Sequence, residues 1–575
     1  MKSPQVEKRL AAWIGEILAR MKRHPDGIID PHLRRDQPGN ARYQEACLTL
    51  ALASKHEAFH PEGVLEIDLQ NAAVQAVEGL LTLQHKSGGF RAHPAGKPET
   101  HTTAYGIYAC SRTLKELGDQ APSHLHQRAG KAIRKAARFV MQRSLPPGVE
   151  LRAVQYAAFQ TAADWLQDFH LYNSAERFHR EARQQLERVL SLERHGGRPT
   201  DAGGLSLALA YLTTPTERKM ELPAILIDHL TNRCIASLTP SGLYGGGGEG
   251  RLNSLPIPLG FERYATDHPT AAAIAAGLYD GWEANFYMSA LDHHVSYLTP
   301  LSYLVLEAAL IRRSRSAKQY PADYEIEENL WSPGEGRMHL QDWILRLGPG
   351  GTIGWLYHRP SDSSRIFGSP DGLALREGPW IIKGNLIRQP ALAGTYKVTN
   401  KQAPYRVEGE LPRIPLPGAK SRPRGIGLRG RATHRDSAQR IVPAPSRISP
   451  RPGAGTPYRR EIEMKDGALT IETWIEGRVM HRIPLIWLGG HWGKLAIDEV
   501  ETPPDLTLME QRIRKIQLSD HLHPDWTMRF DKPVDVLYEP IHGAVNMHPM
   551  RYLAVAAASL DVISENRMHV AIRVR

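Results

Sequence analysis

Residues 300–358, PLSYLVLEAALIRRSRSAKQYPADYEIEENLWSPGEGRMHLQDWILRLGPGGTIGWLYH, mark the point at which the 575-residue chain changes from one structural pattern to another. Residues 300–314 repeat apolar side chains at helical spacing. WILRLG (343–348) and TIGWLYH (352–358) are instead short, alternating segments rich in β-branched and aromatic residues, which is typical of strands. We therefore expect a helical domain over 1–318 and a β domain over 319–575.

Segments with helical periodicity fill the chain upstream of this change, and most are rich in alanine and leucine. Because they follow one another in consecutive pairs, they predict a closed or nearly closed (α/α) toroid. Glycine-rich turns recur between them, at SGGF (87–90), DAGG (201–204) and YGGGG (244–248). The predicted helices lie at residues 5–23, 41–57, 68–84, 101–118, 124–143, 151–170, 174–191, 203–213, 222–236, 266–280, 284–297 and 300–314.

Short strands with polar turns dominate downstream, and their composition predicts an antiparallel β-sandwich. Besides the two segments quoted above, the predicted strands are LALREGPWIIKG (373–384), ALTIETWIEG (468–477), HRIPLIWLGG (481–490), WTMRFD (526–531), VDVLYE (534–539) and RMHVAIRVR (567–575).

The net charge of +11 is concentrated in one segment, residues 411–460, which contains twelve basic residues and one acidic residue. The rest of the chain is therefore formally neutral, and a nucleic-acid partner is not expected. Nine prolines and the run of like charge oppose regular structure there, so we predict a mobile basic loop within the β domain. Two interpretations of this loop stay open: an inert insertion, or a flap that recruits a polyanion.

Targeting and cysteine patterns favour a protein of the cytoplasm. The first 24 residues have an amphipathic helical pattern without the apolar centre of a signal peptide, and no apolar run is long enough to span a membrane. A chain that had lost a signal peptide would instead be periplasmic or secreted. Cys47, Cys110 and Cys234 are isolated, which predicts three small buried hydrophobes rather than disulfides or a zinc site.

Residues 241–303 combine tyrosine, histidine, arginine and asparagine with a glycine run, a mixture that ordinary packing rarely needs. If residues 282–297 form a helix, Asn285, His293 and Tyr297 recur along one stripe, with Tyr287 and His294 beside it. A core-facing stripe would be aliphatic. We therefore predict a functional site here, the alternative being a buried helix that merely satisfies its histidines.

Two motifs resemble those of known enzymes. SGGFRAH (87–93) followed by TTAYG (102–106) is similar to the Gly-Ser-Phe, histidine, Tyr-Gly segment of the chondroitin and hyaluronate lyases. GWEANFYMSALDHHVSYL (281–298) looks like a cleft helix that offers asparagine, histidine and tyrosine together. With the paired helices and the following β domain, the chain resembles the toroid polysaccharide lyases, namely the heparinase II/III, chondroitin AC and oligoalginate lyase relatives.

The resemblance implies cleavage of an acidic, uronate-containing polysaccharide or oligosaccharide by β-elimination. The site must then neutralise the uronate carboxylate, remove the proton on carbon 5 and protonate the oxygen that leaves carbon 4. No metal or cofactor is needed, and none is expected. The candidate catalytic residues are Asn285 for the carboxylate, His293 or His294 as base, and Tyr297 or Tyr244 as acid. The candidate substrate-binding residues are Arg251, Arg263, Tyr264, Glu249, Trp282, Tyr287, His101 and Arg91.

Two other functions remain open. A toroid glycoside hydrolase would need two carboxylates across the cleft, for which the candidates are Glu249, Asp267, Asp280 and Glu283. A noncatalytic glycan-binding scaffold would use the basic loop and aromatic side chains such as Trp165 and Trp282, which could stack on sugar rings. Neither function would need an ordered histidine and tyrosine stripe.

Overall fold

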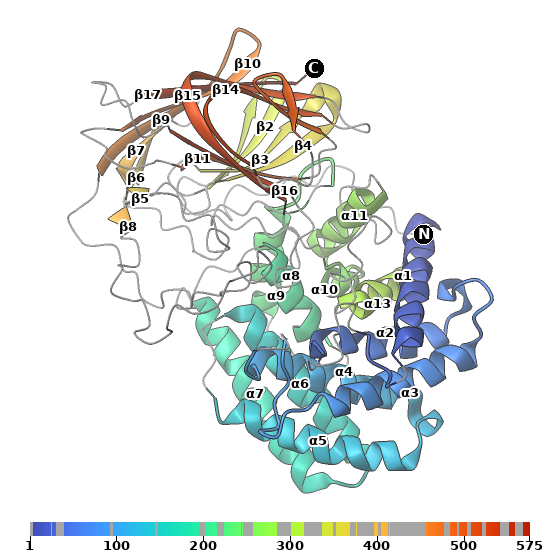
Figure 1. Cartoon of the computed structure of the whole chain (residues 1–575). Helices are drawn as coiled ribbons and strands as arrows, with labels where there is room; N and C mark the ends of the chain where they lie inside the picture. The colour runs from blue at the N-terminus through green and yellow to red at the C-terminus, as the bar shows by residue number, and fades with distance from the viewer. Residues whose placement is uncertain are drawn as a thin grey trace, which may run out of the picture. The chain divides into compact units, whose positions relative to one another are not determined.

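A computed structural model of the chain describes two compact units, one helical and one built of strands (Figure 1). The first comprises Met1–Ile235, Leu255–Tyr324 and Ala544–Pro549, and the second comprises Ala236–Ser254, Glu325–Gly543 and Met550–Arg575. The described residues are 4–574 without 25, 30–38, 93–95, 144–147, 195–201, 215–223, 243, 245–256, 284–300, 315–335, 349–351, 369–374, 377–395, 401–403, 412, 415–455, 476–483, 491–493, 503–507, 520–524, 541–550 and 558–566.

The helices of the first unit follow the predicted periodicity closely. They are α1 (Pro4–Arg23), α2 (Ala46–Ser54), α3 (Glu66–Thr82), α4 (Thr100–Leu117), α5 (Ser123–Met141), α6 (Val149–Asp168), α7 (Tyr172–Arg194), α8 (Ala202–Leu212), α9 (Ala224–Ile235), α10 (Leu259–Tyr264), α11 (Pro269–Glu283) and α13 (Ser302–Ser314), with the 3₁₀ turns η1 (Ala41–Glu45), η2 (Glu57–Phe59) and η3 (Gly118–Gln120). The sequence pattern did not predict α10, because six residues are too few to show a helical period. The helix expected over 284–297 lies outside the described residues.

Helix α4 is largely enclosed by its neighbours. It packs against α2, α5 and α6, and small residues such as Ala104 and Ala109 are fully buried along it. Cys47, Cys110 and Cys234 are buried free thiols, as expected. Thr113 on α4 donates a hydrogen bond to the sulfur of Cys47 on α2 at 3.2 Å. This bond links α4 to α2.

The second unit is a large antiparallel sheet in the order β1-β2-β3-β4-β11-β16-β15-β17-β10-β9-β7-β6. Off this path, β14 pairs with β15, β12 pairs with β14, and β13 pairs with β12. Its strands are β1 (Gly336–Leu340), β2 (Trp343–Gly348), β3 (Thr352–His358), β4 (Ser363–Gly368), β6 (Tyr396–Asn400), β7 (Tyr405–Leu411), β9 (Thr456–Lys465), β10 (Ala468–Ile475), β11 (Pro484–Gly490), β12 (Lys494–Ile497), β13 (Val500–Thr502), β14 (Leu508–Ser519), β15 (Trp526–Pro540), β16 (Arg551–Ala557) and β17 (Arg567–Val574). Alternate residues along a strand, such as Trp343, Leu345 and Leu347 of β2, belong to its apolar core.

Three details of the second unit correct the sequence interpretation. The segments 526–531 and 534–539 form one strand, β15, rather than two. Within 373–384, the described strand is only β5 (Leu375–Arg376), and it pairs in parallel with β8 (Arg413–Ile414). The basic loop expected over 411–460 is shorter at both ends, because Leu411 ends β7 and residues 456–460 belong to β9. Residues 415–455 lie outside the described part of the chain.

The described residues provide neither a membrane-spanning helix nor a metal centre. No described helix is long and apolar enough to cross a membrane. In the same part of the chain, no group of three or more histidine, cysteine, aspartate or glutamate side chains is arranged to hold a metal ion.

Candidate functional site

A cluster of polar side chains gathers at the first turn of α4. His101 Nε2 lies 2.9 Å from Glu99 Oε2, and the two side chains are 39% and 34% exposed, so both reach solvent. Thr102 donates a hydrogen bond to the same Glu99 oxygen at 3.0 Å. Burial alone would raise the pKa of Glu99, but the hydrogen bonds from His101 and Thr102 and the charge of Arg42 hold it below its usual range. An anionic Glu99 can therefore orient the imidazole of His101.

The SGGF turn brings Arg91 to this end of α4. Phe90 bridges Glu99 as an isolated antiparallel pair, and the backbone of Arg91 accepts a hydrogen bond from the amide of Ala41 at 3.0 Å. The turn requires glycine, because Gly88 has a φ of +95° and a Cβ there would lie 2.5 Å from the carbonyl oxygen of Lys135. The Nε of Arg91 is buried without a hydrogen-bond partner among the described residues.

Behind His101, an ion pair stacks on a tyrosine. The guanidinium of Arg42 lies 3.6 Å from the ring centroid of Tyr105, and its Nη2 donates to Glu45 Oε2 at 3.3 Å. Glu45 is fully buried, and burial raises its pKa against the opposing charge of Arg42. Arg42, Glu45, Arg91, Glu99, His101 and Tyr105 are called the α4 cluster below.

The tyrosines deeper in the unit form a packed aromatic group. The ring of Tyr211 lies 5.7 Å from that of Tyr105 and 5.1 Å from that of Tyr108, and its hydroxyl is hydrogen-bonded to that of Tyr303. Burial raises the pKa of Tyr105 even though Arg42 opposes the shift. Arginine therefore does not make this tyrosine a base, and its hydroxyl keeps its proton at neutral pH.

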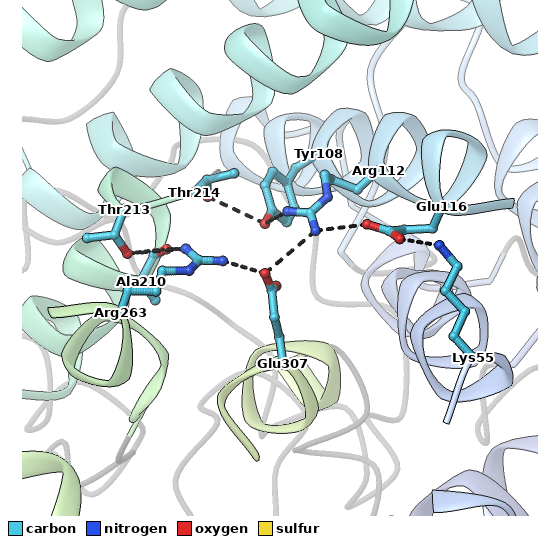
Figure 2. Close-up of polar contacts among 9 residues, drawn as sticks. All are labelled: Lys55, Tyr108, Arg112, Glu116, Ala210, Thr213, Thr214, Arg263 and Glu307. Atoms are coloured by element: carbon cyan, nitrogen blue, oxygen red, sulfur yellow. Dashed lines mark hydrogen bonds and ion pairs between the residues drawn. The ribbon is translucent and has the colours of Figure 1, made fainter. Parts of the chain in front are cut away.

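Arg263 has a structural role instead of the substrate-binding role expected from the sequence. Its guanidinium bonds to Glu307 at 2.5 Å and to the carbonyl oxygen of Ala210 at 3.0 Å, and its side chain is only 9% exposed. Glu307 also lies 3.6 Å from Arg112, which bonds onward to Glu116 (Figure 2). Burial of Glu307 would raise its pKa, but Arg263 and Arg112 outweigh that effect and lower it.

The structure also corrects the roles expected for Tyr244 and Trp165, because both side chains are buried. Tyr244 is fully buried in the second unit, so it lacks the access that a catalytic acid needs. Trp165 is 1% exposed and packs against His126 and Phe169, so it belongs to the core and does not stack on a sugar. Tyr264, at the end of α10, stays half-buried, and burial raises its pKa.

The other expected site residues lie wholly or partly outside the described part of the structure. The backbone of Trp282 belongs to α11, but its side chain is not among the described ones. The residues that lie wholly outside are Asn285, Tyr287, His293, His294, Tyr297, Glu249 and Arg251. Of the sequence-derived candidates, the structure places His101 in the first turn of α4 and Arg91 next to Phe90, whose backbone pairs with that of Glu99. It adds Arg42, Glu45 and Glu99, which are ordinary charged residues at helix ends and gave no sequence signal.

No protein-family model matches the chain, and no curated protein matches it. Similar solved structures include the Paenibacillus xanthan lyase, which is 10% identical with a TM-score of 0.42 and coverage of 98% of this chain and 57% of that one. The Streptomyces coelicolor A3 chondroitin AC lyase in complex with chondroitin sulphate is 10% identical, with a TM-score of 0.47 and coverage of 98% and 82%. Heparinase III is 10% identical, with a TM-score of 0.45 and coverage of 100% and 94%.

These neighbours belong to the class that the sequence resembles, the toroid polysaccharide lyases. The chain spans little more than half the length of the xanthan lyase.

Proposed function

We propose that the chain is a lyase that cleaves an acidic, uronate-containing polysaccharide or oligosaccharide by metal-independent β-elimination, on an (α/α) toroid joined to an antiparallel β-sandwich. The observation that supports this proposal is the half-exposed His101, held 2.9 Å from the anionic Glu99 at the first turn of α4. A carboxylate in this position orients an imidazole, as a general base requires.

The α4 cluster offers groups for the first two tasks of the reaction. His101 removes the proton on carbon 5, the carbon 4–oxygen bond breaks, and a double bond forms between carbons 4 and 5. The charge of Arg91 stabilises the uronate carboxylate while the carbanion develops. The stripe of Asn285, His293, His294 and Tyr297 remains part of the proposal, with Asn285 assisting Arg91 and Tyr297 protonating the leaving oxygen.

One pair of candidate hydrolase carboxylates, Asp267 and Asp280, is too widely separated to act together. Asp267 shortly precedes α11 and Asp280 lies in its last turn, so nearly the whole helix separates them. At a rise of 1.5 Å per residue their backbones are about 20 Å apart. Paired glycosidase carboxylates lie within about 10 Å of each other.

The proposal predicts that His101→Gln lowers turnover by about a hundredfold or more, because the base is removed. Turnover is followed by the ultraviolet absorbance of the unsaturated uronate product. Glu99→Gln should lower turnover less, since His101 remains but loses its orienting carboxylate. His124→Gln is a matched control, because His124 is a 63% exposed histidine in the first turn of α5 and also faces a glutamate, Glu78, at 3.8 Å.

His293→Ala, measured beside these variants, separates two assignments of the base. If His293→Ala abolishes turnover and His101→Gln does not, the base lies on the stripe and His101 is at most a binding residue. Circular dichroism must show the same helix content in every variant before the rates are compared.

A further inference from the structure

A cavity with a volume of about 520 Å³ lies in the helical unit, beside the C-terminal end of α2. Its described lining comes from the chain that leaves α2 and runs through η2, and from the end of α13. A volume of this size is typical of pockets that hold small organic molecules. The lining residues include Lys55, His56, Glu57, Ala58, Leu310 and Arg313.

Two cationic side chains of the cavity are ion-paired to neighbouring helices. Lys55 Nζ lies 2.6 Å from Glu116 on α4 (Figure 2), and Arg313 Nη1 lies 3.0 Å from Glu7 on α1. The guanidinium of Arg313 also lies 5.7 Å from the ring centroid of the fully buried Phe59. These contacts hold both cations at the cavity wall. The side chains of Lys55 and Arg313 are still 45% and 31% exposed, so a ligand can reach them.

His56 indicates the sign of the electrostatic potential in the cavity. Burial lowers the pKa of His56, and the charges of Lys55 and Arg313 lower it further. Glu116 opposes this shift less than either cation promotes it, and His60 adds to the shift. The potential at His56 is therefore positive even though both cations are paired with carboxylates.

The lining offers three kinds of contact to one ligand. Lys55 and Arg313 can donate charge-assisted hydrogen bonds to an anionic group. Glu57 can accept hydrogen bonds from hydroxyl groups, and Ala58 and Leu310 provide apolar contact for a carbon skeleton. An inorganic ion would fill only a small part of the cavity. The set of contacts therefore fits a hydroxylated organic anion.

We infer that this cavity is a binding site for a small hydroxylated organic anion, either a sugar acid or a sugar phosphate. The site is separate from the α4 cluster. Glu116, which pairs with Lys55, and His101 lie near opposite ends of α4, about 22 Å apart at 1.5 Å per residue. The inference does not rest on the proposed lyase activity, because the site is defined by binding alone.

The direct test follows the titration of His56 in the unaltered, full-length chain. Exchange of the histidine C2 hydrogen, measured by mass spectrometry, gives the pKa of each histidine separately. Glucuronate bound in the cavity should raise the pKa of His56, because a nearby anion stabilises the protonated imidazole. His124 is the control, since it is a 63% exposed histidine that faces Glu78 instead of the cavity, and its exchange should not change.

A panel of ligands at equal ionic strength separates the two sources. A larger shift with glucuronate than with glucose 6-phosphate identifies a sugar acid, and the reverse identifies a sugar phosphate. No shift with either anion would overturn the inference. An equal shift with sulfate would also overturn it, because the carbon skeleton would then contribute nothing. An equal shift with glucose would do the same, because the cations would then recognise no charge.

A second measurement changes the cavity wall. Arg313→Met should raise the dissociation constant of whichever sugar anion shifts His56 more by about tenfold or more, because charge-assisted hydrogen bonds are lost. Arg128→Met is the matched control, since Arg128 is a 51% exposed arginine of the same unit that lies 3.6 Å from Glu78. Equal dissociation constants in Arg313→Met and the unaltered protein would contradict the site. If Arg313→Met does not fold, the titration of His56 in the unaltered chain decides alone.

Discussion

The buried carboxylate of Glu45 makes the stability of the folded protein depend on pH. It is fully buried, and burial raises its pKa above the ordinary 4.5 despite the ion pair with Arg42. At a pH between 4.5 and the raised pKa of about 8, Glu45 holds a proton in the folded protein that it has released in the unfolded chain. The contribution of protonated Glu45 to the stability of the folded protein is therefore complete below the unfolded pKa, and it is lost as pH rises through the folded pKa.

We predict that the free energy of unfolding of the unaltered protein falls, relative to Glu45→Gln, as pH rises from about 5 through neutrality. The difference should change by at most about 1.4 kcal/mol per pH unit, the limit for one proton. Urea denaturation at a series of pH values measures both proteins. Parallel profiles would show that Glu45 does not carry a raised pKa.

At the scale of secondary-structure elements, Glu307 joins three helices. It projects from α13 toward Arg263 on α10 and Arg112 on α4 (Figure 2). Its side chain is 10% exposed, so its removal leaves two arginines largely buried without their shared anion. Breaking a buried pair from one side costs about 3–5 kcal/mol.

Glu307→Gln should accordingly lower the free energy of unfolding by about 3 kcal/mol or more in urea denaturation. Glu116→Gln serves as the control. Glu116 bonds to the same Arg112, but its side chain is 22% exposed and its other partner, Lys55, is 45% exposed, so about 1 kcal/mol is expected. Equal losses in the two variants would show that the three helices are not tied through Glu307.

Local pattern and long-range contact differ in how well the sequence predicts them. Apolar periodicity located α4, α6 and α11 to within a few residues, and alternation located β2 and β3, because these patterns arise within one element. The pairings Arg42–Tyr105 and Arg263–Glu307 join segments 63 and 44 residues apart, and nothing local specifies them. For that reason the sequence alone suggests a substrate-binding role for Arg263 and gives no signal for Glu99.

At the scale of the whole molecule, the α4 cluster lies within the helical unit. The central proposal is that this protein cleaves an acidic glycan by elimination. Such cleavage creates one unsaturated uronate for every new reducing end, whereas hydrolysis creates reducing ends alone.

The most direct measurement is a screen of uronate-containing polysaccharides in the presence of a metal chelator, with ultraviolet absorbance and reducing ends recorded together. We expect that one of them yields both products in equal amounts and that the chelator does not change the rate. New reducing ends without the ultraviolet absorbance, or activity that the chelator abolishes and a divalent ion restores, would contradict the proposal.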